Sequence, residues 1–124
     1  MITEPGTRLL IVDDSPLVLG AIVRIARARS IPHVALASLG SALAAVNDLP
    51  VIAVITDFDL GEARTGADVL RAVRTRWPDA KRVLMSGSSP EVLQPADLEN
   101  LAHRFVEKPF NSAQLVELLE WASS

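Results

Sequence analysis

Five short apolar segments alternate with segments of helical periodicity along this chain, and this alternation restricts the fold more than any other feature. The apolar segments lie at Arg8–Val12, His33–Ala37, Val51–Thr56, Arg82–Met85 and Arg104–Val106. Apolar residues recur at helical spacing over Leu17–Ala28, Leu39–Asn47 and Gly66–Arg76, and in a last segment that begins at Asn111. Strands that alternate with helices form a parallel sheet covered on both faces. The sequence therefore predicts an α/β domain, with Val51–Thr56 as a fully buried strand because it is apolar on both faces.

Two of the predicted helices carry clear start signals. Asp14 or Ser15 can cap the first helix, and Pro16 suits its first turn. Asn111, with Gln114 three residues later, resembles a capping box at the start of the last helix. We therefore expect these helices to begin at those positions.

Length and composition fit one small domain. The 124 residues contain no repeat, linker or low-complexity tract, so we expect a single domain over residues 1–124, with its core at about 8–122 and no separate output domain. No apolar run approaches the ~20 residues that a membrane helix needs, residues 1–7 lack signal-peptide character, and cysteine is absent. These features favour a cytoplasmic protein with no membrane contact. The net charge of −3 argues against direct binding to nucleic acid.

Polar side chains follow the predicted strands at their carboxyl ends. Asp13 and Asp14 follow the first strand, Asp57 the third, Ser86 the fourth and Lys108 the fifth. Ligands of open α/β sheets bind outside these ends, which meet at one edge of the sheet, so the five groups should converge. Three carboxylates in close proximity repel one another, and a hard divalent cation such as Mg2+ would relieve that repulsion. With a lysine and a hydroxyl added, such a site suits phosphoryl transfer.

Four motifs at these strand ends resemble the response regulator receiver domain family of two-component signalling. They are IVDDS at 11–15, VITDFDL at 54–60, VLMSG at 83–87 and FVEKPF at 105–110, in the family's order and at its usual spacing. The resemblance covers essentially the whole chain. It implies a flavodoxin-like, doubly wound sheet of five parallel strands in the order 2-1-3-4-5, with helices on both faces. It also implies a phosphoacceptor that catalyses only its own phosphorylation and dephosphorylation.

The resemblance further implies a phosphorylation site with bound Mg2+. Asp57 would accept a phosphoryl group from a partner histidine and form an acyl phosphate. Asp14 would bind Mg2+ directly and Asp13 mostly through water, with Asp57 and the backbone carbonyl of Asp59 as further ligands. Lys108 would contact a phosphoryl oxygen.

A switch is implied beside this site. The Ser86 hydroxyl would hydrogen-bond the phosphoryl group, and Phe105 would be the aromatic residue that moves into the space that Ser86 vacates. The Lys108–Pro109 peptide bond would be cis. Taken singly, Asp14 could be a helix cap, Ser86 a turn residue, Lys108 a surface lysine and Phe105 a core residue.

The implied partners are a histidine kinase or a histidine phosphotransfer protein, and a downstream target that binds the face formed by the fourth helix, fifth strand and fifth helix. The domain could act alone or be part of a hybrid kinase or a larger regulator, and the resemblance leaves homodimer formation open. His33 and His103 are expected to be surface or strand-edge residues rather than phosphoryl carriers.

Three features depart from the family pattern. The loop LGEARTG at 60–66 has Gly61 where proline is usual, and it is one residue longer before Gly66. Position 59 is acidic, and we hypothesise that Asp59 tunes the lifetime of the phosphorylated state. Pro95 falls where the interior of the fourth helix should lie, and an interior proline costs about 3 kcal/mol. We therefore predict that this helix is short, kinked or split near Gln94–Pro95.

Two other functions stay open. The sequence Asp57–Phe58–Asp59 after a buried strand resembles the DxD motif of haloacid-dehalogenase-like phosphatases, although an acidic pair here precedes that strand and the chain has no room for a cap domain. The chain could also be a receiver-like scaffold that signals without phosphate.

Overall fold

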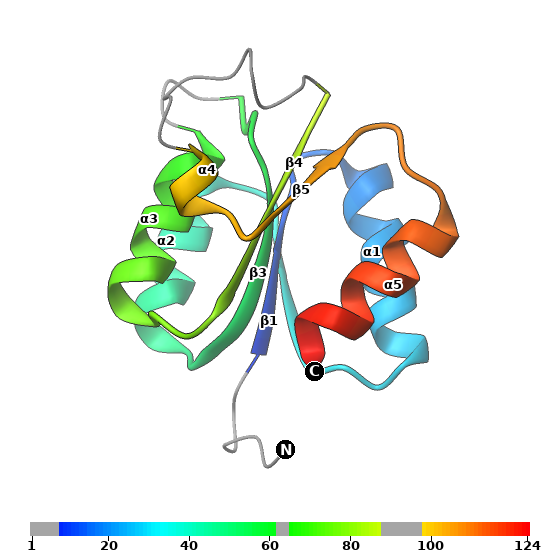
Figure 1. The fold of residues 1–124 in the computed structure, drawn as a ribbon, viewed down its shortest axis with the longest axis horizontal. Helices are drawn as coiled ribbons and strands as arrows, with labels where there is room; N and C mark the ends of the chain where they lie inside the picture. Colours follow the sequence, from blue (N-terminus) through cyan, green and yellow to red (C-terminus); the bar gives the residue numbers. More distant parts are fainter. Residues whose placement is uncertain (1–7, 62–64, 88–97) are drawn as a thin grey trace.

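The computed structural model describes residues 8–61, 65–87 and 98–124 of the chain. Within those ranges five strands alternate with five helices, as the periodicity predicts (Figure 1). In chain order the elements are β1 (Arg8–Val12), α1 (Pro16–Ala28), β2 (His33–Leu36), α2 (Leu39–Asp48), β3 (Val51–Asp57), α3 (Gly66–Arg76), β4 (Lys81–Ser86), α4 (Leu98–Leu101), β5 (Arg104–Glu107) and α5 (Ser112–Ser123). Their ends coincide with the predicted ones or differ by one residue wherever bounds were predicted.

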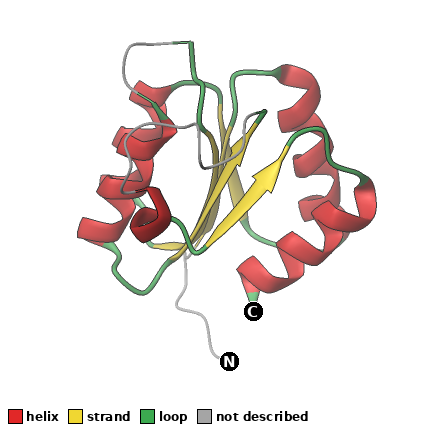
Figure 2. Ribbon diagram, turned by 45° about the horizontal axis from the view of Figure 1, so that its top comes forward, coloured by secondary structure: helices red, strands yellow, loops and turns green. Residues whose placement is uncertain are grey.

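The five strands form one parallel sheet in the order β2-β1-β3-β4-β5. Helices α1 and α5 cover one face of this sheet, whereas α2, α3 and α4 cover the other (Figures 1 and 2). The predicted flavodoxin-like, doubly wound fold and its strand order are therefore confirmed. Because all strands run the same way, the carboxyl ends of β1, β3, β4 and β5 lie at one edge.

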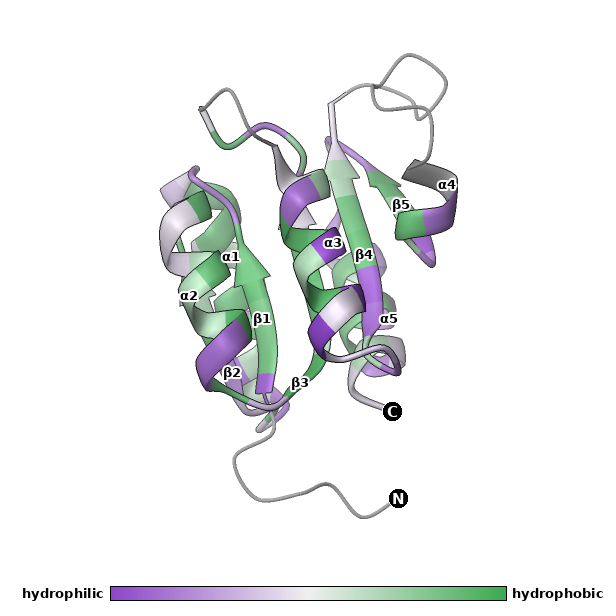
Figure 3. Cartoon of the chain, turned by 90° about the vertical axis from the view of Figure 1, so that its left-hand side faces the viewer, coloured by the Kyte–Doolittle hydropathy of each residue, from purple (hydrophilic) through white to green (hydrophobic). Residues whose placement is uncertain are grey.

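A hydrophobic core lies on each side of the sheet. Leu10 and Val12 of β1 belong to the core under α2 and α3, whereas Leu9 and Ile11 belong to the core under α1 and α5. Successive side chains of a strand point to opposite faces, so a strand covered on both faces has to be apolar throughout. Figure 3 shows this most clearly for β1, which is hydrophobic over most of its length, whereas β4 is hydrophilic where it begins and hydrophobic beyond that. Each such side chain contributes about 1.5–3 kcal/mol through burial.

The predicted helix starts are confirmed in detail. Ser15, rather than Asp14, caps α1, because its side chain accepts a hydrogen bond from the Val18 amide and Pro16 opens the helix. At α5 the Asn111 side chain accepts from the Gln114 amide at 2.9 Å, and the Gln114 side chain accepts from the Asn111 amide at 2.8 Å.

One prediction, and part of one departure from the family pattern, lie outside the described residues. The segment that contains Gln94 and Pro95, on which the broken-helix prediction rests, is not described, and neither are residues 62–64 of the loop after β3. The described part of α4 spans Leu98–Leu101.

No helix among the described residues has the length and apolar character needed to cross a membrane.

Candidate functional site

The carboxyl end of β1 places two adjacent aspartates in different surroundings. Asp13 is fully buried, whereas Asp14 is exposed. The chain turns here from β1 into α1, and the Asp13 Oδ1 atom accepts a hydrogen bond of 2.8 Å from the Ser15 amide. This bond fixes the Asp13 carboxylate beneath the turn and leaves that of Asp14 facing solvent.

The chain at the end of β3 is held by backbone hydrogen bonds to β4 and to the start of α3. The Phe58 amide donates to the Met85 carbonyl of β4 at 2.9 Å, and the Gly66 amide at the start of α3 donates to the Phe58 carbonyl at 2.8 Å. The buried Thr56 hydroxyl donates to the Asp57 carbonyl at 3.0 Å. These bonds fix the Asp57 backbone. Asp57 as a whole residue is only 6% exposed.

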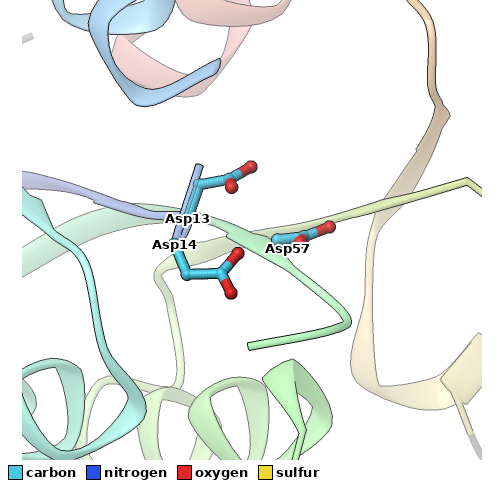
Figure 4. Close-up of side chains that lie close together, drawn as sticks. All are labelled: Asp13, Asp14 and Asp57. Atoms are coloured by element: carbon cyan, nitrogen blue, oxygen red, sulfur yellow. The ribbon is translucent and has the colours of Figure 1, made fainter. Parts of the chain in front are cut away.

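Asp13, Asp14 and Asp57 form an acidic cluster. One carboxylate oxygen from each can be chosen so that all three lie within 4.8 Å of one another. Figure 4 shows the three side chains side by side at the ends of two neighbouring strands, with their carboxylates pointing to the same side. The convergence expected from the strand ends is therefore found for these three carboxylates.

Lys108 joins two members of the cluster. Its Nζ atom lies 3.0 Å from Asp13 Oδ2 and 3.1 Å from Asp57 Oδ1. The Lys108 amide donates to the Ser86 carbonyl at 2.8 Å, which extends the β4–β5 ladder and aims the lysine back toward β3. One ammonium cannot balance three carboxylates, so the ionised site carries an excess of negative charge.

The electrostatics of Asp57 follow from this crowding. The pKa of Asp57 is raised from 3.8 to about 6, chiefly by burial and next by the charge of Asp13, whereas the hydrogen bond and charge of Lys108 act in the opposite direction. For Lys108, burial acts to lower the pKa, but the hydrogen bonds to Asp13 and Asp57 outweigh burial and the net shift is upward. The site therefore keeps its lysine charged and leaves Asp57 easier to protonate than an ordinary aspartate.

The two predicted switch residues lie on adjacent strands. Ser86 ends β4 and is 8% exposed. Phe105 of β5 is half-buried, sits opposite Leu84 in the ladder and packs against the core under α2 and α3. The Lys108–Pro109 bond is cis, as the resemblance implied.

Asp59 lies outside the acidic cluster. Its side chain is exposed, and its Oδ1 atom accepts a hydrogen bond of 3.0 Å from the Gly61 amide. The histidines lie at the opposite edge of the sheet, where strands begin: the His33 ring contacts the Ile31 carbonyl at 2.8 Å, and the His103 ring accepts from the Arg82 amide at 2.9 Å. Their expected strand-edge positions are confirmed.

Three interactions that shape the site were not predicted from the sequence. They are the Ser15 amide that holds Asp13, the Thr56 hydroxyl that holds the Asp57 backbone, and the packing of Gly66 against the Asp57 carbonyl. A threonine inside an otherwise apolar strand was the available signal for Thr56. The other two depend on backbone geometry and leave little trace in the sequence.

Comparison with known proteins gives a consistent result. The family model for the response regulator receiver domain matches residues 9–120. Response regulators described as NtrX-like from Rickettsia bellii and Rickettsia felis are each 30% identical over 115 residues, which cover 92% of this chain and 24% of the relatives. The chain thus spans about a quarter of the length of the curated relatives it matches.

Solved receiver structures share the fold at low sequence identity. A CheY-like receiver domain from Methanospirillum hungatei superimposes with a TM-score of 0.81 at 23% identity, over 93% of this chain and 91% of that one. The Thermotoga maritima protein TrrA, solved in complex with Mg2+ and BeF, gives 0.78 at 22% identity, over 94% and 98% of the two chains. A Burkholderia pseudomallei response regulator with a phosphorylated aspartic acid and a calcium ion gives 0.78 at 19% identity, over 95% and 66%.

Proposed function

This chain belongs to the response regulator receiver domain family, and we propose that it is a phosphoacceptor in a two-component phosphorelay. In this proposal Asp57 takes a phosphoryl group from a phosphohistidine of a histidine kinase or a histidine phosphotransfer protein. The observation that carries the proposal is the Lys108 ammonium, which lies 3.1 Å from Asp57 Oδ1 at the edge where three carboxylates meet. Phosphoryl transfer depends on this kind of fixed positive charge beside a positioned nucleophile.

The transfer converts the Asp57 carboxylate into an acyl phosphate. A carboxylate oxygen attacks the phosphorus, the P–N bond breaks, and its electron pair stays on the histidine nitrogen, which takes up a proton. Asp57 must be ionised to attack, and a pKa of about 6 leaves it mostly ionised at neutral pH. Lys108 neutralises part of the charge on the phosphoryl oxygens. Attack by water later releases phosphate, so the domain acts only on its own phosphoryl group.

The donor set of the acidic cluster fits Mg2+. Among the described residues Asp14 has no hydrogen-bond or ion-pair partner, so its exposed carboxylate is available as a direct ligand. Both oxygens of Asp13 are already engaged, by the Ser15 amide and by Lys108, which supports binding through water. Asp57 and the Asp59 carbonyl would complete the protein ligands. When bound, the cation neutralises charge on the transferring group. The TrrA complex with Mg2+ and BeF supports this assignment.

The phosphorylated form would report to a partner. In this proposal the Ser86 hydroxyl turns to the phosphoryl group, Phe105 moves inward, and the face formed by α4, β5 and α5 changes its affinity for a downstream protein target. Phosphorylation then shifts an equilibrium between two forms of the domain. We place this activity in the cytoplasm. A measurement of the oligomeric state of the phosphorylated protein would show whether two copies also pair through this face.

Chelation tests the metal-dependent part of the proposal. The purified chain is incubated with acetyl phosphate in Mg2+ or in EDTA, and the phosphorylated fraction is separated on a phosphate-affinity gel. We expect a shifted band with Mg2+ and its loss in EDTA or in Asp14→Asn. A chain that never shifts would instead support a receiver-like scaffold that signals without phosphate.

The phosphatase alternative gains no support from the site. The Asp59 carboxylate is bonded to the Gly61 amide and lies outside the cluster around Asp57. Multiple turnover of a phosphomonoester by the isolated chain would favour that alternative, whereas stoichiometric labelling of Asp57 favours the receiver.

A further inference from the structure

The turn that follows β3 is closed by a side chain. The Asp59 Oδ1 atom accepts the Gly61 amide at 3.0 Å, and Gly61 has a φ of +73°, a conformation that glycine adopts without strain. Leu60, between them, is 4% exposed and packs into the core under α2 and α3. The turn is therefore held on its inner side by Leu60, which packs into the core, and on its exposed side by the hydrogen bond from the Gly61 amide to Asp59. A proline at position 61 could not donate this bond, since it has no N–H.

The turn borders the acidic cluster on the Asp14 side. A β-carbon built on Gly61 would lie 3.4 Å from Asp14 Oδ2, so the Gly61 backbone is next to the carboxylate that has no described partner. The same turn includes the backbone carbonyl of Asp59. Two of the ligands assigned to Mg2+ thus come from this turn or lie beside it.

We propose that the Asp59 side chain is a positioning residue for divalent cation binding: by accepting the Gly61 amide, it holds the 59–61 turn against Asp14. The inference rests on the proposed function, because it presumes that the acidic cluster binds Mg2+. This role is separate from the hypothesised effect of Asp59 on the lifetime of the phosphorylated state, and it follows from the hydrogen bond that the carboxylate makes within its own turn. Removing a group that orients metal ligands typically lowers metal affinity about 10- to 100-fold.

A charge effect is the competing explanation, because a fourth carboxylate near the cluster would attract a cation without positioning anything. Asparagine separates the two effects, since its side-chain oxygen can close the same turn without the charge. Alanine removes both the acceptor and the charge. Asp79 is a matched control: it is exposed, and it precedes β4 at the opposite edge of the sheet.

The test is a calorimetric titration of Mg2+ into the unphosphorylated full chain in 0.15 M salt, where the Debye length is about 8 Å. We expect Asp59→Ala to lose roughly tenfold in affinity, while Asp59→Asn and Asp79→Ala stay close to the unsubstituted chain. The Gly61 amide resonance in a 15N correlation spectrum should move in Asp59→Ala and stay near its original position in Asp59→Asn.

Two results would overturn the inference. One is an unchanged affinity in Asp59→Ala, and the other is an equal loss in Asp59→Asn and Asp59→Ala, which would assign the effect to charge. If the unsubstituted chain does not bind Mg2+, the metal site itself is wrong and the inference falls with it, an outcome distinct from the first two.

Discussion

Gly66 begins α3 directly against the backbone of Asp57: a β-carbon at position 66 would overlap the Asp57 carbonyl oxygen and approach the Thr56 hydroxyl at 3.1 Å. The first turn of α3 and the end of β3 are therefore in contact through their backbones. The Gly66 amide strengthens this contact by its bond to the Phe58 carbonyl at 2.8 Å. The position of the proposed phosphoacceptor is thus tied to the start of a helix.

We expect Gly66→Ala to destabilise the fold by about 1–3 kcal/mol or more, because the new methyl group can be placed only by separating α3 from β3. Urea denaturation measures the change. Gly20→Ala is the matched control, because a β-carbon there meets nothing within 4 Å, and alanine in a helix interior should stabilise by about 0.5–1 kcal/mol. Equal effects at the two positions would contradict the packing described here.

Lys108→Met should raise the pKa of Asp57 above the value of about 6 in the unsubstituted chain, because the hydrogen bond and charge of Lys108 lower it. The measurement is a titration of the Asp57 side-chain carboxyl carbon by NMR, without divalent cations. Added Mg2+ should lower the apparent pKa in both proteins. An Asp57 that titrates near 4 in the unsubstituted chain would show that burial and the neighbouring carboxylates do not raise its pKa in solution.

Asp57→Asn should stabilise the metal-free protein, and the gain should depend on pH. The carboxyl has its ordinary pKa of 3.8 when unfolded and about 6 when folded, so the folded state binds the proton more tightly. The stability that the folded protein gains from this tighter proton binding is lost as the pH rises from about 4 to above 6. Above this pH range the unfolding free energy of Asp57→Asn should exceed that of the unsubstituted chain by on the order of 2 kcal/mol. The difference should disappear toward pH 4. Denaturant unfolding in EDTA across this range measures it, and a difference independent of pH would refute the prediction.

Saturating Mg2+ should raise the unfolding free energy of the unphosphorylated chain, because the ligands converge only in the folded state. At a concentration 100 times the dissociation constant the gain is about 2.7 kcal/mol. Asp14→Asn should lose most of this gain, whereas Asp79→Asn should keep it. Thermal unfolding with Mg2+ or EDTA makes the comparison. A gain that survives in Asp14→Asn would place the cation elsewhere.

The placement of the acidic cluster could be predicted because it depends on topology alone. Asp13, Asp57 and Lys108 follow strands of one parallel sheet, and the order of those strands is enough to bring them together. The resemblance implied different roles for Asp13 and Asp14, but the burial of Asp13 and the exposure of Asp14 could not be predicted from two adjacent aspartates. Their difference arises from the turn into α1, where the Ser15 amide selects Asp13.

Asp59 illustrates a second limit. Its effect on the lifetime of the phosphorylated state stays a prediction, whereas the hydrogen bond from the Gly61 amide to its carboxylate was not predicted. That bond depends on the local geometry of the turn, which an aspartate two residues before an amide permits without demanding. Local backbone geometry of this kind, unlike strand order, has to be observed.

Intact-protein mass spectrometry after incubation with acetyl phosphate and Mg2+ shows whether Asp57 accepts a phosphoryl group. We expect a gain of one phosphoryl group per chain, located at Asp57 by peptide mapping and absent in Asp57→Ala. No gain in mass by the folded, Mg2+-bound chain, or an equal gain in Asp57→Ala, would contradict it.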